Sequence, residues 1–512
     1  MRPAIPPEPA DEPATGAPRV PRHGVTVPRG LGAVSETAPS AGRFGRMFPD
    51  ASSCDVSDDA IRALLTFMGD PRRNPPSSNN SRIPAGFTYL GQFVDHDLTF
   101  DPTSKLDRRH DPRALVNFRT PRLDLDSLYG SGPTAQPFLY DWKDSAPAGA
   151  RLLVGRNPAH HPDDPAVALA ADDLPRNRQG RALIGDARND ENLIVAQLHL
   201  LFMRFHNAVV DALCARGDVQ SCDLFDEAQR TVRWHYQWIV VHEFLRLVVG
   251  EATADAVLPP APVGAAAEAH LKHFRCEPDP FIPVEFSGAA YRFGHSMVRG
   301  SYGIKRAPSS GPPPHAVTLF PGLEGLTWLP QSVVIDWERF FDLPGAPADP
   351  QRSGLIDTAI VDPLFALPDT TPSSLPERNL LRGRALGLPS GQCVACAMGE
   401  PPLSEQDLGL DDAFPPEERA ELRRSTPLWF YVLCEAALQR DAPPPRPGGV
   451  HLGPVGGRIV AEVLVGLLAC DPDSFLSAQP TWRPCYGQNG DFTMADLVMF
   501  STDQPRPLNG GG

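Results

Sequence analysis

The segment Gly91-Gln92-Phe93-Val94-Asp95-His96-Asp97 (GQFVDHD, residues 91–97) sets an amide, two carboxylates and a histidine in one short stretch. Gln92 precedes His96 by four residues, so the two side chains share a face if the segment is helical. A neutral imidazole can take a proton from one substrate atom and return it to another, which makes His96 a candidate general base. Asp95 and Asp97 point to other faces and are free for other roles. Taken alone, the segment also fits a helix that exposes its acids to solvent.

The whole chain has the composition of an ordinary soluble globular protein. It has 512 residues, of which 41% are hydrophobic and 21% charged, enough for a core that buries a cofactor. The net charge of -15 disfavours nucleic acids and anionic membranes as partners. No basic start followed by an apolar run is visible, and the apolar stretch at 459–469 is too short to span a bilayer. We expect a soluble protein, cytoplasmic or non-classically exported, of undetermined oligomeric state.

The cysteines carry little information. Of the nine cysteines, only Cys393 and Cys396 form a Cys-x-x-Cys pair, and no second pair lies at the spacing of a zinc site. We interpret the cysteines as unremarkable thiols. Their number mildly favours a reducing compartment, without excluding export.

Apolar periodicity predicts a mainly α-helical protein with long connecting loops. Residues 1–43 are rich in Pro and Ala and read as a disordered or loosely attached arm, 44–505 as one large domain, and 506–512 as a flexible tail. Helices are predicted near 58–68 with Asp58-Asp59 as N-cap, 194–209 with a stop at Gly217, 232–249, 428–438 and 457–469. The irregular stretches 143–180, 252–280 and 300–350 are interpreted as loops that wrap a site.

A second segment, TPRLDLD at residues 120–126, carries oxygen atoms at alternate positions. In an extended loop such atoms converge on one point, and calcium prefers six to eight hard oxygen ligands. The candidate ligands are Thr120, the carbonyl of Arg122, Asp124, Asp126 and, from the first segment, Asp97. A solvated acidic turn is the alternative for this segment in isolation.

A third segment, GDARNDE at residues 185–191, contributes a cation. The guanidinium of Arg188 can stabilise an anion and the charge that develops on a leaving oxygen. Glu191 stands where a helical pattern begins. Alternatively, Glu191 only stabilises the start of that helix, because the helix dipole favours acids in the first turn.

A fourth segment, RFGH at residues 292–295, offers a metal ligand. A histidine after glycine can approach a planar cofactor closely, and neutral imidazole is a common haem ligand. Arg292 is a candidate partner for a cofactor carboxylate, and Asn379 in NLLR (379–382) can accept the ring N–H of His295 and fix its tautomer. When such a motif occurs alone, the commoner interpretation is a core histidine that binds no ligand.

Together these segments resemble a known family. The chain is similar to the animal-type haem peroxidases of the peroxidase–cyclooxygenase superfamily, and looks like a bacterial member. The motifs that carry the resemblance are GQFVDHD (91–97), TPRLDLDSLYG (120–130), GDARNDE (185–191), RFGH (292–295) and NLLR (379–382). No single motif is specific for the family. Five motifs in the family's order, each with its own role, are specific for it.

The resemblance implies a role for each candidate residue. On the distal side of the haem, His96 is implied to be the base, with Gln92 beside it and Arg188 as the cation. On the proximal side, His295 is implied to ligate the iron and Asn379 to bond to its ring, while Arg292 and Arg382 face the haem propionates. The implied calcium ligands are Asp97, Thr120, Arg122 through its carbonyl, Asp124 and Asp126. Asp95 and Glu191 occupy the positions that form ester bonds to haem in mammalian relatives.

The implied activity is that of a peroxidase with haem b and Ca²⁺. It would reduce hydrogen peroxide to water through a ferryl intermediate while oxidising a small organic donor, a halide or a pseudohalide, a chemistry linked to the response to oxidative stress. Two alternatives stay open: a haem-dependent oxygenase acting on a lipid or secondary metabolite, and a haem-binding protein without catalysis.

Three positions depart from well-known relatives. Asn192 stands where myeloperoxidase has a methionine that bonds to haem, which puts strong chloride oxidation in doubt. Cyclooxygenases carry a radical tyrosine three positions before the proximal histidine, where this chain has Arg292, with Tyr291 one residue off. This argues against cyclooxygenase-like oxygenation of fatty acids. Asp126 replaces a serine of many relatives, which adds a carboxylate to the implied calcium site.

Overall fold

The computed structural model describes residues 42–502, except 73–78, 144–146, 278–279, 307–315, 347–349, 412–413 and 442–446. Of the predicted arm, residues 1–41 lie outside the described residues, while Gly42 and Arg43 belong to a strand. The predicted tail, residues 506–512, also lies outside them. The limits of the predicted domain therefore stay a prediction.

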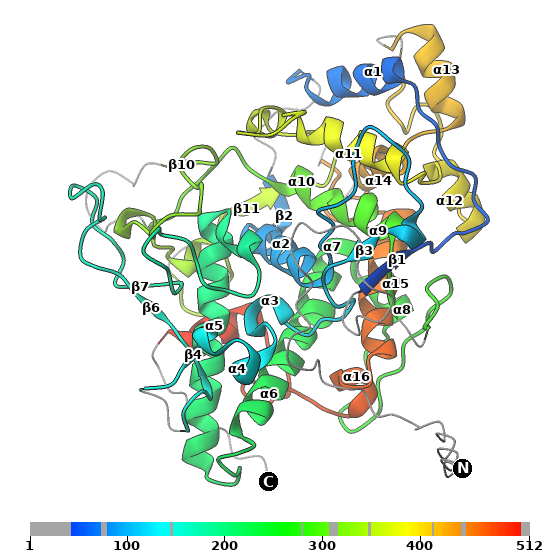
Figure 1. Ribbon diagram of the computed structural model, residues 1–512. Helices are drawn as coiled ribbons and strands as arrows, with labels where there is room; N and C mark the ends of the chain where they lie inside the picture. Colours follow the sequence, from blue (N-terminus) through cyan, green and yellow to red (C-terminus); the bar gives the residue numbers. More distant parts are fainter. Residues whose placement is uncertain are drawn as a thin grey trace, which may run out of the picture.

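Helices are the main regular structure of the described chain, which confirms the mainly α class (Figure 1). The α-helices are α1 (Asp58–Met68), α2 (Gly86–Leu98), α3 (Asp126–Tyr129), α4 (Gly132–Ala135), α5 (Leu193–Arg216), α6 (Leu224–Ile239), α7 (Leu245–Val249), α8 (Glu251–Val257), α9 (Val284–Gly288), α10 (Gly294–Met297), α11 (Leu375–Ala385), α12 (Gly391–Met398), α13 (Pro416–Arg424), α14 (Leu428–Ala437), α15 (Pro454–Cys470), α16 (Phe475–Ala478) and α17 (Met494–Ser501). The 3-10 helices are η1 (Pro112–Ala114), η2 (Pro137–Leu139), η3 (Ala187–Asp190), η5 (Ala290–Phe293), η6 (Gln331–Val333), η7 (Trp337–Arg339) and η8 (Asp362–Phe365), and η4 (Val240–Phe244) is a π-helix.

Strands are short. They are β1 (Gly42–Gly45), β2 (Asn79–Pro84), β3 (Val116–Asn117), β4 (Tyr140–Asp141), β5 (Arg151–Leu152), β6 (Gly155–Arg156), β7 (Asp172–Asp173), β8 (Phe281–Pro283), β9 (Ser301–Tyr302), β10 (Val317–Thr318) and β11 (Arg352–Gly354). β1 is the middle strand of a three-stranded sheet, antiparallel to β3 and parallel to β8. The other sheets described are two-stranded pairs.

The predicted helices are present, with differences at their ends. Gly217 ends α5 in the left-handed region at φ 75°, which glycine adopts without steric cost. The helix predicted at 232–249 begins earlier, at Leu224, and runs through α6, η4 and α7 without a break. Ser57, and not the following aspartates, caps α1, because its side chain accepts the N–H of Ala60.

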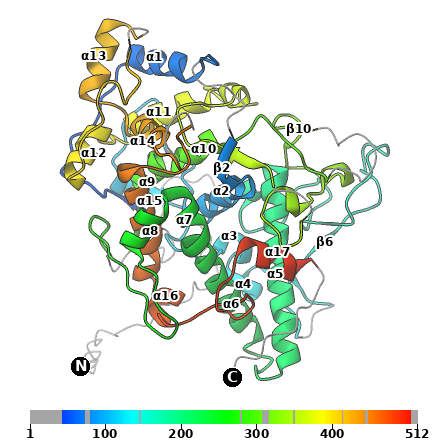
Figure 2. The ribbon, with the colours of Figure 1, turned by 180° about the vertical axis from the view of Figure 1, so that it is seen from behind.

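Helix α2 lies in the middle of the molecule and packs against α5 and α10 (Figures 1 and 2). Its apolar side chains Leu90, Phe93 and Val94 are fully buried. Phe93 stacks on Phe202 of α5 with ring centroids 5.0 Å apart. Burial of this face fixes the rotation of α2, and therefore the direction in which its polar residues point.

One loop prediction and the interpretation of the cysteines need correction. The stretch 252–280 is not irregular throughout, because α8 covers Glu251–Val257. The interpretation of all cysteines as unremarkable thiols is wrong for Cys276 and Cys470, which form a disulfide with Cα atoms 5.4 Å apart. This bond ties the segment before β8 to the end of α15, across 194 residues of sequence. The pairing depends on tertiary packing, so the spacing of cysteines along the chain gave no sign of it.

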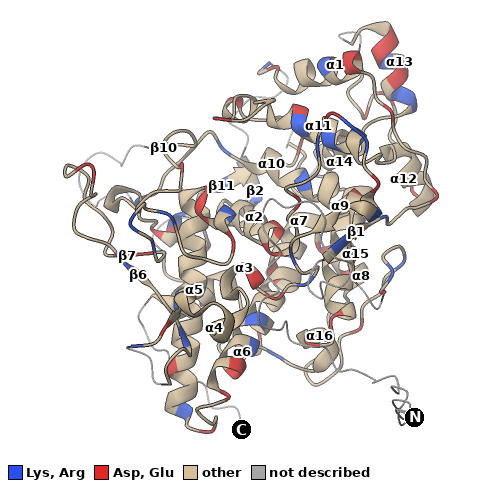
Figure 3. Cartoon of the chain, viewed as in Figure 1, with Lys and Arg blue, Asp and Glu red and all other residues tan. Residues whose placement is uncertain are grey.

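One described helix, α5, is long and apolar enough to cross a membrane by length and composition. Its most apolar window is 83% buried inside the protein, where it packs against α2, α6 and α17. Elsewhere charged residues of both signs mark exposed helices such as α13 (Figure 3). α13 has acids in its first turn and arginines in its last, which suits the helix dipole.

Candidate active site

The structure brings remote segments together around one cavity of about 390 Å³. This volume lies in the range of small-molecule and cofactor sites. The polar residues on its wall are Gln92, Asp95 and His96 from α2, Glu191 and Asn192 from the start of α5, and Arg292 and His295 from η5 and α10. The remaining wall is largely apolar and aromatic, as at Phe244, Phe293 and Phe320. Four of the five motifs in the sequence contribute here or to the adjoining contacts.

Helix α2 carries His96 into the cavity on the face opposite its buried apolar residues. The His96 side chain is 6% exposed, and its Nδ1 lies 2.8 Å from Oδ1 of Asn189. Burial, followed by the charge of Arg188, lowers the pKa of His96 to about 4. The imidazole is therefore neutral at pH 7, as a general base must be.

Arg188 occupies a different position from the one expected. It lines a neighbouring cavity of about 210 Å³, which shares Asp95 and Arg292 with the larger one. Its Nη2 donates to Oδ2 of Asp186 at 2.7 Å and to the carbonyl of His96 at 2.9 Å. The guanidinium also lies over the ring of Phe100, 4.5 Å from its centroid. Arg188 thus holds the backbone of His96 from outside the main cavity.

His295 faces the same cavity from α10. Nδ2 of Asn379, on α11, lies 2.8 Å from Nδ1 of His295, so the two residues are in contact, with the amide nitrogen rather than the expected acceptor oxygen facing the ring; that oxygen faces Arg292. Burial, and then the charge of Arg292, lowers the pKa of His295 to about 3, leaving a neutral ring. The preceding Gly294 faces open space, because a Cβ at this position would meet no atom within 4 Å. A planar group can therefore approach the backbone beside His295.

Two arginines next to the cavities lack an acidic partner. Among the described residues, neither Arg292 nor Arg382 forms a salt bridge; Arg292 donates to the carbonyl of Ser287 and Arg382 to the hydroxyl of Ser104. Burial and the nearby charge of Arg382 lower the pKa of Arg292 to about 10. Two neighbouring part-buried cations repel each other unless an anion joins them, so this pair of arginines suits a ligand with carboxylates.

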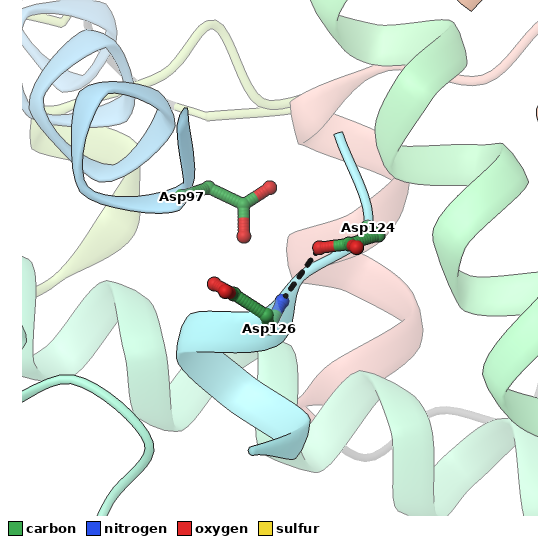
Figure 4. A group of neighbouring side chains, drawn as sticks. All are labelled: Asp97, Asp124 and Asp126. Carbon is green, nitrogen blue, oxygen red and sulfur yellow. Dashed lines mark hydrogen bonds between the residues drawn. The ribbon is translucent and has the colours of Figure 1, made fainter. Parts of the chain in front are cut away.

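Three carboxylates from two predicted motifs converge behind α2 (Figure 4). Ligand atoms of Asp97, Asp124 and Asp126 lie within 4.8 Å of one another, and Oδ1 of the fully buried Asp97 has no hydrogen-bond partner. Burial and the two neighbouring acids raise the pKa of Asp97 well above its usual range. Thr120 donates its hydroxyl to Asp124 at 2.8 Å, while the side chain of Arg122 turns away to Asp471. Such a group requires a cation or protons to offset its repulsion.

Several residues that fix this site carry no recognisable pattern in the sequence. Asn189 lies within hydrogen-bond distance of both His96 and His199. Arg176, from the loop 174–186, forms ion pairs with Asp173 and Asp190 that are almost fully buried. Arg119 joins Asp126 to Asp186. Each depends on contacts between loops and helices that local sequence does not encode.

The animal haem peroxidase family model matches residues 103–424. The chain belongs to the animal haem peroxidase family. The matched residues include the second, third, fourth and fifth motifs, whereas the segment 91–97 precedes them. The structure joins that segment to the others at one cavity.

Individual relatives are distant. Thyroid peroxidase of Homo sapiens is 28% identical over 299 residues, covering 54% of this chain and 30% of its own length. Peroxidase mlt-7 of Caenorhabditis elegans is 26% identical over 288 residues, covering 55% of this chain and 36% of its own length. The matched part of the chain therefore spans about a third of these curated relatives.

Solved structures show the same fold with different activities. Peroxidase A from Dictyostelium discoideum superposes with a TM-score of 0.62 at 15% identity, covering 91% of this chain and 94% of its own. The Oryza sativa fatty acid alpha-dioxygenase superposes with a TM-score of 0.56 at 15% identity, covering 87% of this chain and 76% of its own. The fold is thus the one that a peroxidase and a dioxygenase share.

Proposed function

We propose that the protein is a haem peroxidase that reduces hydrogen peroxide to water while oxidising small organic donors, halides or pseudohalides. The observation that carries the proposal is one cavity, in a member of this family, lined by two neutral histidines from remote elements. His96 is the proton-handling group on one side, and His295 is the metal-binding group on the other.

The residues present fit haem b. His295 would hold the iron, with Asn379 fixing its ring, and the open space at Gly294 would admit the porphyrin. Arg292 and Arg382, which form no salt bridge among the described residues, would pair with the two propionates. When bound, haem supplies the redox chemistry, and the protein supplies position, charge and protons.

His96 then moves the proton. Hydrogen peroxide in the cavity would give a proton from one oxygen to His96, which would return it to the other oxygen; that oxygen would leave as water, with the bound haem supplying the two electrons and keeping the remaining oxygen. Gln92, one helical turn away on the same wall, can hydrogen-bond the peroxide or a halide. Arg188 acts through its bond to the His96 carbonyl and through its charge, which favours the developing negative charge.

The acidic cluster supports a calcium site as part of this proposal. Asp97, Asp124 and Asp126 would be ligands, with Thr120 and the carbonyl of Arg122 completing the set. The partnerless oxygen of Asp97 supports a cation here. A cation bound there would fix the backbone of Asp97 and so aim the adjacent His96.

A variant of the proposed base tests this function. Purified protein is reconstituted with haem and mixed with peroxide, and the change in haem absorption is followed by stopped flow. We expect His96→Gln to bind haem but to react about 10²- to 10⁴-fold more slowly, the usual contribution of a general base. His206→Gln is the matched control, since it replaces another buried histidine that bonds to Tyr129 and Ala150 instead. Equal rates for His96→Gln and wild type would remove His96 from this role, and haem binding without any peroxide reaction in wild type would indicate a non-catalytic haem protein.

A haem-dependent oxygenase is the second candidate, favoured by the fold shared with the fatty acid alpha-dioxygenase and by the apolar cavity wall. Position 292 argues against it, since arginine stands where cyclooxygenases carry their radical tyrosine. Oxygen uptake with a fatty acid, compared with peroxide-dependent oxidation of bromide, iodide, thiocyanate and a phenolic donor, separates the two activities.

A further inference from the structure

Three buried side chains form a continuous hydrogen-bonded chain that ends at His96. Nδ1 of His96 lies 2.8 Å from Oδ1 of Asn189, and Nδ2 of the same amide lies 3.0 Å from Nδ1 of His199. The three residues are 6%, 0% and 1% exposed, in the order His96, Asn189 and His199. Water therefore cannot replace a missing partner, and each proton in the chain has a defined place.

The chemistry of the amide decides where those protons are. An amide oxygen only accepts and an amide nitrogen only donates. Nδ1 of His96 must therefore carry its proton and donate it to Asn189, which leaves Nε2 with a free lone pair. Nδ1 of His199 must be bare to accept from Asn189, so the proton of His199 sits on Nε2.

We propose that Asn189 and His199 are positioning residues that fix His96 in the tautomer with a bare Nε2. His199 acts indirectly, because its bare nitrogen sets which way the Asn189 amide faces. If the amide turned over, its nitrogen would face Nδ1 of His96, and the proton of His96 would move to Nε2. A histidine with a protonated Nε2 cannot accept the proton of a peroxide. This role rests on the function proposed for His96.

The surroundings hold Asn189 still. Asn189 lies on η3 between Arg188 and Asp190, and both neighbours are anchored. Arg188 pairs with Asp186, and Asp190 accepts two hydrogen bonds from the buried Arg176 at 2.7 and 2.8 Å. On the other side, the ring of His199 packs edge-on against Phe93 of α2, with centroids 6.1 Å apart. With its backbone held, the Asn189 amide can turn only about its own side-chain bonds. Its two hydrogen-bond partners therefore decide which way the amide faces.

Nuclear magnetic resonance of the full chain, labelled with ¹⁵N at histidine and without added haem, tests the tautomer directly. Loss of one signal set in His96→Gln assigns His96. We expect the ring proton of His96 on Nδ1 in wild type and on Nε2, wholly or in part, in Asn189→Leu and His199→Leu. A wild-type proton on Nε2, or the same tautomer in all three proteins, would overturn the proposal. This readout needs no peroxidase activity, so it stands apart from the fate of the proposed function.

The second measurement follows the reaction of the haem-loaded proteins with peroxide across pH. We expect Asn189→Leu to lower the rate about 10- to 100-fold, as is usual when the partner of a functional histidine is removed. Its rate should rise with pH where the wild-type rate is flat, since peroxide must then lose its proton to solvent. His199→Gln should restore most of the rate lost in His199→Leu, because its amide oxygen again accepts from Asn189. Equal rates for His199→Gln and His199→Leu, or a pH profile of Asn189→Leu parallel to wild type, would indicate a merely structural role.

Discussion

Asp95 and Glu191 show what a single side chain can contribute to holding a cofactor. Both carboxylates reach the main cavity, Asp95 from α2 and Glu191 from the turn before α5. Asp95 also accepts the hydroxyl of Thr99 at 3.0 Å, which limits its rotation. Asn192, in contrast, presents an amide to the cavity, so no sulfur is available there for a third bond.

We expect covalent haem through both carboxylates. After turnover with peroxide, mass spectrometry of the denatured protein should show the chain with haem attached. Asp95→Asn and Glu191→Gln should each leave one link, and the double variant should release haem into acidified organic solvent. Haem that extracts freely from the wild-type protein would exclude the ester bonds while leaving the peroxidase proposal intact.

At the scale of elements, loops rather than helices fix the distal machinery. The carbonyls of Asp190 and Glu191 accept N–H groups from the loop that contains Gly325 and Leu326. Arg176, from another loop, holds the carboxylate of Asp190. Of the predicted loops, 300–350 contributes Leu319 and Phe320 to the wall of the main cavity, whereas the described residues of 143–180 do not line it and act through Arg176.

Removal of Arg176 should destabilise the protein strongly. Its side chain is 0% exposed, and Asp173 and Asp190 are 3% and 1% exposed, so Arg176→Met leaves two buried carboxylates without a cation. Asp173 keeps the N–H groups of Leu174, Leu329 and Asn157 as donors. What is lost is therefore the cation between the two carboxylates, and we expect the free energy of unfolding to fall by about 3 kcal/mol. Arg156→Met is the control, because Arg156 pairs with Asp172 at the surface and is 77% exposed; its effect should stay within about 1 kcal/mol. Denaturant titration of both variants measures the difference, and similar losses would contradict the assigned burial.

The acidic cluster links two other elements, α2 and the loop leading into α3. If it binds calcium, chelation should lower the thermal midpoint, and calcium at about 100 times its dissociation constant should return about 2.7 kcal/mol. Asp124→Asn should weaken this response. Calorimetry with calcium, with magnesium and with chelator measures it. An identical midpoint in all three conditions would leave the cluster as a proton-sharing group.

For the whole molecule, buried histidines predict sensitivity to acid. Burial lowers the pKa of four of them to between about 3 and about 4: His199, His206, His235 and His242. Their folded pKa lies below the unfolded value of 6.5, so the unfolded chain binds more protons as pH falls. The stability they provide is complete above pH 6.5 and is lost between pH 6.5 and about 4. At about 1.4 kcal/mol per pKa unit, the three histidines with a folded pKa of about 4 contribute up to about 3 kcal/mol each, and His199, at about 3, up to about 5 kcal/mol.

Buried carboxyls act with the opposite sign, which allows a sharp test. Burial raises the pKa of Glu243 to about 8, so its contribution to stability falls as pH rises from 4.5 towards 8. In unfolding experiments from pH 4.5 to 8, His206→Gln should flatten the acid side of the stability curve. Glu243→Gln should flatten the alkaline side. Changes on the other side in either variant would contradict these shifts.

Much of this molecule could be foreseen from its sequence because it is encoded locally. The apolar repeat of α5 and its stop at Gly217 follow from helix geometry and from the conformational freedom of glycine. The motifs around His96, Asp124, Arg188 and His295 named the chemical groups of the site, since each motif is a short run of residue types with a definite reactivity. Their order along the chain was enough to indicate the family.

Only the tertiary structure decided how those groups relate to one another. It placed Arg188 behind His96 rather than in the main cavity, joined Cys276 to Cys470, and put His199 next to Asn189. The physical reason is the same in each case. The direction of a side chain depends on how its helix rotates to bury an apolar face, as Phe93 does against Phe202, and that rotation is set by partners far away in the sequence. The residues of GQFVDHD thus carried the chemistry, while packing determined which cavity, carboxylate or amide each of them meets.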